Sequence, residues 1–203
     1  LVALLISSYV NGRNLRSKQA GWTAYFDAMG APNAEGFEAV SKAFPGTPAG
    51  AWALQTAGDL RLDESLRQMF QDRETAQQEL LAAREIYEQV LQVSRDPMLK
   101  QRALFGLAKS LESQGELDQA EAKYEEITSV WPTSQIGHLA QNRLDELQKP
   151  STKPWYTWFA EQEPVRSPLT DPDVFQDLPN LPDRPDFQMP AAGQLLPSDG
   201  APA

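Results

Sequence analysis

Residues 101–134 contain two sets of apolar residues at helical spacing, separated by a short segment that contains one glycine. The first set is Leu104, Leu107, Ala108 and Leu111, and the second is Leu117, Ala120, Tyr124 and Ile127. Spacings of three and four residues place each set on one face of a helix. Gly115 lies between the sets, where a residue able to adopt positive φ can end a helix, and Pro132 ends the second helix. The pattern predicts an antiparallel helical hairpin, which needs stacked neighbours to bury both of its faces.

Apolar residues at helical spacing also lie on both sides of this hairpin. We expect further helices over residues 15–29, 37–44, 52–70, 80–91 and 136–147. The helix over residues 136–147 has no predicted partner after it, so we expect it to cap the stack. The sequence therefore predicts an all-α fold of stacked antiparallel helical hairpins over residues 15–148.

Residues that favour helix starts mark the junctions between these segments. Asn33 and Asp72 are expected N-caps. Thr47 and Asp96 are each followed by a proline, which is the order expected of a cap and a first-turn proline.

The hairpin resembles one complete tetratricopeptide repeat, a motif of about 34 residues. The residues at its diagnostic offsets are Leu104, Leu107, Ala108, Leu111, Gly115, Ala120, Tyr124, Ile127 and Pro132. Ala83, Tyr87 and Val90 repeat the spacing of the second helix, so residues 52–91 resemble a divergent repeat. The chain is similar to bacterial membrane-anchored tetratricopeptide proteins such as the ancillary Sec translocon subunit. It is more distantly similar to the lipoprotein of the outer-membrane β-barrel assembly machinery, although it has no cysteine for lipidation. The resemblance implies a short solenoid that serves as an adaptor outside the cytoplasm, in the periplasm or an equivalent compartment.

The first 14 residues are a separate segment, and residues 1–10 are apolar apart from two serines. Ten residues are too few to span a bilayer as a helix. We interpret them as the end of a membrane anchor that emerges at Arg13, Arg16 and Lys18. The alternatives are a remnant of a signal peptide and a buried N-terminal helix. The basic residues favour a cytoplasmic side by the positive-inside tendency, which leaves the orientation open.

Residues 149–203 differ in composition from the rest, with eleven of the sixteen prolines at or after Pro150. Eight acidic residues against three basic ones follow Pro150, and apolar periodicity is weak. We therefore expect an extended, Pro-rich acidic tail. The aromatic island at residues 155–159 is different, because Trp155, Tyr156, Trp158 and Phe159 are costly to leave in water. It is expected to dock either on the chain's own helices or on a partner.

Composition excludes several function classes. A net charge of −10 and a pI near 4.6 argue against a nucleic-acid partner. The chain has no cysteine and one histidine, His138, for which we expect a partly exposed packing role. The sequence has no Gly-rich phosphate loop, serine elbow or paired metal motif. We therefore expect no catalytic residue, no metal, no cofactor and no small-molecule substrate, and the carboxylates beside lysines indicate a solvated helix face.

The principal hypothesis is a non-catalytic adaptor, or scaffold, that is attached to a membrane and presents a helical-repeat groove to a partner protein. Helical phase places four candidate partner-binding residues on the groove face of the first helix of the repeat: Arg102, Phe105, Lys109 and Ser113. The alternative is a permanent structural subunit of a membrane-associated assembly, with the tail as a strap. An enzyme built on His138 is a third class.

Overall fold

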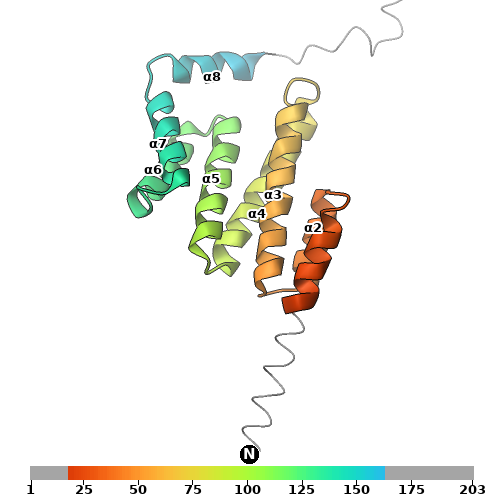
Figure 1. The fold of residues 1–203 in the computed structure, drawn as a ribbon. Helices are drawn as coiled ribbons and strands as arrows, with labels where there is room; N and C mark the ends of the chain where they lie inside the picture. Colours follow the sequence, from red (N-terminus) through yellow and green to blue (C-terminus); the bar gives the residue numbers. More distant parts are fainter. Residues whose placement is uncertain (1–17, 163–203) are drawn as a thin grey trace, which may run out of the picture. The chain divides into compact units, whose positions relative to one another are not determined.

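The computed structural model describes residues 18–162, and every regular element in that part of the chain is a helix (Figure 1). A first helix over residues 18–28 precedes seven others. These are α2 (Ala34–Ala43), α3 (Pro48–Gln68), α4 (Arg73–Val93), α5 (Pro97–Ser113), α6 (Leu117–Val130), α7 (Gln135–Leu147) and α8 (Thr152–Glu161). The all-α prediction is confirmed for these residues. The expected anchor segment, residues 1–14, and the tail beyond residue 162 lie outside the described residues.

The helices begin where the cap residues predict. The Asn33 side chain accepts from Gly36 N at 2.7 Å, and Thr47 Oγ1 accepts from Gly50 N at 3.1 Å. Asp72 and Asp96 cap α4 and α5 in the same way, with acceptor distances of 3.1 and 2.9 Å. Pro48 and Pro97 occupy the first turn of their helices, where the missing amide hydrogen costs nothing. All four predicted caps are confirmed.

Gly115 ends α5 in a left-handed conformation, with φ of 80°. Glu116 N donates to Leu111 O at 2.9 Å, and Gly115 N donates to Glu112 O at 2.9 Å. These two bonds form a Schellman motif, which satisfies carbonyls at the helix end and turns the chain into α6. The expected role of Gly115 is confirmed.

Helices that follow one another in sequence pack together from α2 to α7, and α3, α4 and α5 run in alternating directions (Figure 1). In addition, α3 contacts α5 and α5 contacts α7, so these three helices share one side of the packing. The core runs through all of the pairs, and its largest fully buried side chains include Phe37, Leu80, Tyr87, Leu111 and Tyr124. Two glycines in helices make room for one of these rings.

Tyr87 of α4 lies between Gly58 of α3 and Gly106 of α5 and is fully buried. A Cβ atom at Gly106 would lie 2.3 Å from the Tyr87 ring, and one at Gly58 would lie 2.9 Å from it. The Tyr87 hydroxyl donates to Asp59 Oδ1 at 2.9 Å. Burial and the nearby Asp59 carboxylate raise the pKa of Tyr87, so the phenol stays protonated.

Glu112 of α5 joins four helices. Its carboxylate accepts from the Tyr124 hydroxyl of α6 at 2.9 Å and from the Tyr156 hydroxyl of α8 at 2.6 Å. It also pairs with the guanidinium of Arg143 of α7. Burial and the nearby carboxylate raise the pKa of Tyr124 as well. A buried carboxylate is stable only with such partners, so Glu112 fixes these helices relative to one another.

The expectation of an extended chain from residue 149 is wrong for Thr152–Glu161, which form α8. Consequently α7 is not the last helix of the described chain. Tyr156 and Phe159 are spaced by one helical turn and pack against the core, which stabilises this helix. Pro154 lies in its first turn, where proline is tolerated. The count of prolines therefore misled the prediction for this part.

We predict that Gly106→Ala destabilises the fold by about 1–3 kcal/mol, because the new methyl group overlaps the buried Tyr87 ring. This cost outweighs the roughly 1 kcal/mol that alanine gains over glycine inside a helix. Urea unfolding followed by circular dichroism measures the change. Ser129→Ala, at an exposed position of α6, is the control and should leave stability within about 0.5 kcal/mol. Equal stability of Gly106→Ala and the wild type would contradict the packing role of Gly106.

Candidate functional site

Three of the four predicted groove residues line one cavity of about 210 Å³. We call it the α5 groove. Arg102, Phe105 and Lys109 of α5 form one wall. The other lining residues are Gln55, Asp59 and Leu62 of α3, Tyr87 of α4, Gly106 of α5 and Ile136 of α7. The fourth predicted residue, Ser113, lies elsewhere, in a cavity of about 280 Å³ whose other wall includes Tyr156 and Phe159 of α8.

Arg102 is held in a fixed position at the groove. Its NH2 atom donates to Asp59 Oδ2 at 3.0 Å, and its guanidinium lies over the Trp52 ring, 5.7 Å from the ring centre. Asp59 also accepts from Gln55 Nε2 at 2.9 Å and from the Tyr87 hydroxyl. Almost half of the Arg102 side chain, 45%, stays exposed. The groove therefore presents a preorganised cation whose remaining N–H groups can donate hydrogen bonds to an acceptor.

Lys109 and Phe105 supply the rest of the groove's binding chemistry. The Lys109 ammonium forms no ion pair or hydrogen bond with any residue between 18 and 162. Phe105 is half-buried and meets the Tyr124 ring edge-on at 5.6 Å. Gln55 is 1% exposed, and its Oε1 atom has no hydrogen-bond partner within the described part of the chain. Two cationic side chains, an aromatic ring and a hydrogen-bond acceptor without a donor in the described residues thus lie around this groove.

The aromatic island at residues 155–159 divides into inward and outward side chains. Tyr156 and Phe159 pack against the core, whereas Trp155 and Trp158 are 50% and 55% exposed. The Phe159 ring stacks on Trp155 at 5.3 Å and meets Phe70, from the end of α3, at 5.6 Å. Docking on the chain's own helices is therefore observed for half of the island. A role of the other half in binding a partner stays a prediction.

Arg73 at the start of α4 secures the end of α8. Its NH1 and NH2 atoms donate to Ala160 O at 3.1 Å and to Phe159 O at 3.2 Å. These carbonyls belong to the last turn of α8, where backbone acceptors lack partners within the helix. The guanidinium also lies 5.1 Å from the centre of the Phe159 ring. Lys153 pairs with Asp118 at 2.9 Å at the other end of α8.

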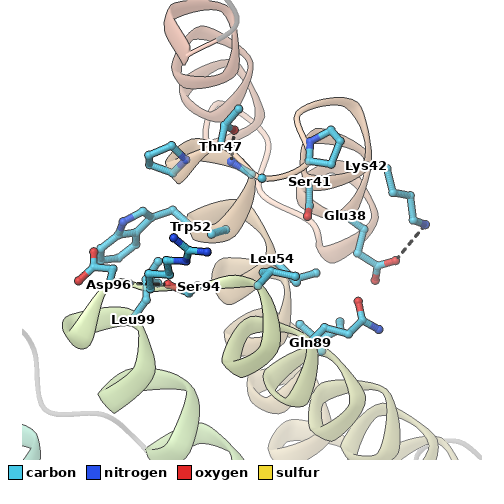
Figure 2. A pocket seen from close by; sticks show the side chains of 18 of the residues that line it. Glu38, Ser41, Lys42, Thr47, Trp52, Leu54, Gln89, Ser94, Asp96 and Leu99 are labelled. Atoms are coloured by element: carbon cyan, nitrogen blue, oxygen red, sulfur yellow. Dashed lines mark hydrogen bonds and ion pairs between the residues drawn. The ribbon is translucent and has the colours of Figure 1, made fainter. Parts of the chain in front are cut away.

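A larger cavity, of about 950 Å³, lies where the α2–α3 connection faces the end of α4 and the start of α5 (Figure 2). Trp52, Leu54 and Leu99 give it apolar walls. Sequence analysis missed this cavity, because its walls come from segments about 40 residues apart and no local pattern records their meeting.

Several polar groups around this large cavity already form hydrogen bonds or ion pairs within the protein. Thr47 Oγ1 donates to Phe44 O at 2.7 Å while it caps α3, and Ser94 Oγ accepts from Asp96 N at 3.1 Å. Glu38 pairs with Lys42 at 3.6 Å, as Figure 2 shows, and with Arg61 at 2.7 Å. The cavity is therefore better suited to an apolar surface than to an ion.

Two further expectations concern His138 and the membrane. His138 is exposed on α7, and residues 18–162 contain no cluster of histidine, cysteine, aspartate or glutamate arranged for a metal ion. Among the helices described, none combines the length and the apolar character that crossing a bilayer requires.

No protein-family model, curated relative or solved structure matches this chain.

We predict that Arg73→Ala loosens α8 without unfolding the rest of the chain, because it removes two charge-assisted bonds to the last carbonyls of that helix. Hydrogen exchange of the amides of residues 155–162 should accelerate by roughly tenfold, while exchange in α5 and α6 stays unchanged. Arg67→Ala is the matched control, since within residues 18–162 Arg67 pairs only with Asp63 and Glu64 of its own helix. Unchanged exchange in α8 would show that Arg73 does not hold it.

Proposed function

We propose that this protein is a non-catalytic adaptor that binds a partner protein in the α5 groove and uses no cofactor. The observation that carries the proposal is the convergence of Arg102, Phe105 and Lys109 with Gln55 and Asp59 of α3 in one groove. Helical phase alone predicts the first three residues as a partner-binding set. Their meeting with polar residues of a neighbouring helix gives them the mixed chemistry of a recognition surface.

The fold that we propose for this adaptor is a short tetratricopeptide-type solenoid. The resemblance of residues 101–134 to one repeat supports it, as does the contact of α3 with α5 and of α5 with α7. In a solenoid of helical hairpins, the first helix of each hairpin lines a shared groove. Most of the lining of the α5 groove comes from α3 and α5, and Ile136 of α7 adds to it, which fits that arrangement.

The groove suits a peptide segment that carries a carboxylate beside an apolar side chain. Lys109 offers an ammonium without a partner in the described part of the chain, and Arg102 offers N–H groups that Asp59 does not use. Phe105 and Ile136 offer the apolar contact. Because Arg102 is already held by Asp59 and Trp52, binding costs little side-chain entropy there. The charges favour rapid association with an acidic segment and exclude a basic one.

The membrane attachment through residues 1–14 belongs to the same proposal, and so does a location outside the cytoplasm. Support for the attachment comes from the apolar composition of residues 1–10 and from the resemblance to anchored repeat proteins. Support for the location comes from that resemblance. The adaptor would then present its groove to a partner at the membrane surface.

A second candidate function is a permanent structural subunit whose C-terminal part straps it to neighbours. The half-exposed Trp155 and Trp158 favour this candidate, because large aromatic side chains are enriched at the centres of protein interfaces. In this version α8 is the first docked part of the strap, and the later tail extends it.

A photocrosslinker tests the groove in its natural surroundings. We expect benzoylphenylalanine in place of Phe105 to crosslink one protein species in detergent-solubilised membranes. The same amino acid at Val130, which is 57% exposed on α6, should not crosslink it. Lys109→Glu should weaken the interaction with that species roughly tenfold, because it replaces an attraction by a repulsion. Equal crosslinking at both positions would contradict groove recognition.

Removing residues 151–203 distinguishes between the two candidate functions, the adaptor and the structural subunit. Retention of the crosslink by a folded truncated chain supports the adaptor. Loss of the assembled complex from a truncated chain that keeps its helix content supports the strap. An unfolded truncated chain would indicate instead that Tyr156 and Phe159 are required to complete the core.

A further inference from the structure

The first helix, residues 18–28, and the turn that follows it carry an apolar stripe on their outer side. Trp22, Phe26 and Met29 follow one another at spacings of four and three residues. Phe26 is 63% exposed and Met29 is 52% exposed, and the Trp22 and Phe26 rings stack at 6.0 Å. We call these three residues the outer stripe. Two of its three side chains thus lie largely outside the core.

The opposite side of the same helix is fully used by packing, so the stripe cannot turn inward. A Cβ atom at Gly21 would lie 3.1 Å from Ala49 Cβ, which shows how closely this helix approaches α3. The Tyr25 hydroxyl and Thr56 Oγ1 are hydrogen-bonded at 3.1 Å, and the Tyr25 ring packs on Phe37 at 5.4 Å. Rotating the helix to bury Phe26 would break these contacts.

The charges and the neighbouring sequence identify what can cover the stripe. Lys18 is exposed one helical turn before Trp22 and continues the stripe with a cation. Arg13 and Arg16 come shortly before it, after the apolar residues 1–10. Asp27 is the one exposed acidic residue among residues 18–30. An apolar stripe that contains tryptophan and adjoins basic residues matches the interface of a bilayer with anionic lipids.

We propose that the outer stripe lies on a lipid bilayer surface, with Trp22, Phe26 and Met29 at the level of the headgroups and Lys18 near lipid phosphates. This inference rests on the proposed membrane attachment, because the apolar residues 1–10 hold the stripe close to the bilayer. Since α2 and α3 pack on the opposite side of the first helix, they lie on the side away from the lipid. The attachment then has a defined orientation rather than a free hinge at residue 14.

A single spin label tests the contact, and the chain is well suited to it because it contains no cysteine. Full-length chain with Met29→Cys carries a nitroxide and is reconstituted into vesicles of phosphatidylcholine and phosphatidylglycerol. Val130→Cys, at a similarly exposed position on α6, is the control. We expect the ratio of collision rates with oxygen and with a water-soluble nickel chelate to be at least roughly threefold higher at Met29, since oxygen concentrates in lipid. Phe26→Glu in the Met29→Cys chain should lower that ratio to the value at Val130, whereas Leu139→Glu on α7 should leave it unchanged.

Three results overturn the proposal in distinguishable ways. Equal ratios at Met29 and Val130, in chains that float with the vesicles, refute the surface contact and leave the attachment standing. A chain that does not float refutes the attachment and the contact together. Dipolar broadening of the Met29 label that disappears on dilution with unlabelled chain shows that a second copy covers the stripe instead of lipid.

Discussion

Two buried tyrosines, each hydrogen-bonded to a carboxylate, determine how successive helices fit together. Tyr87 of α4 donates to Asp59 of α3, which pairs with Arg102 of α5. In the same order, Tyr124 of α6 donates to Glu112 of α5, which pairs with Arg143 of α7. Glu112 is buried and depends on both of its partners, whereas the Asp59 side chain is 39% exposed and is held by the tyrosine and the arginine together. Removing a partner of Glu112 would leave an uncompensated buried charge, and each set joins three consecutive helices.

Helix α5 links the two sets, because it provides the arginine of the first and the carboxylate of the second. This explains why the candidate groove forms on α5. Asp59 and Trp52 fix the position of Arg102, so the ion pair that joins α3 to α5 would also serve the proposed recognition of a partner. Tyr156 adds α8 to the second set through Glu112, and burial together with that carboxylate raises the pKa of Tyr156. The docking of α8 is thus an extension of the interaction that orders the hairpins.

Local chemistry explains which features could be predicted from the sequence. Caps and the Gly115 turn depend on a few adjacent residues, so Asn33, Thr47, Asp72 and Asp96 were all correctly placed. Arg102, Phe105 and Lys109 share a helix face, and helical phase was sufficient to bring them together. Helical phase predicts on which side of a helix a residue lies, but not which other helix is next to it there. Ser113 therefore lines a cavity with α8 and not the α5 groove. Gln55 and Asp59 come from another helix, and their distance from α5 depends on tertiary packing, including that of Tyr87 between Gly58 and Gly106.

The two ends of the helical succession differ in a way that local patterns do not reveal. The side of α7 away from the core is largely polar, with Asn142, Asp145 and Glu146 exposed, as expected of a helix face that meets water. The first helix instead exposes Phe26, and Met29 follows it in the next turn. Helix α8 does not cover Phe26 or Met29, because it packs on α7, on Phe70 after α3, on Arg73 at the start of α4, and on Glu112. The first helix therefore presents an apolar surface that still requires a cover, in addition to Trp155 and Trp158 of α8, and it follows the apolar residues 1–10 in the sequence.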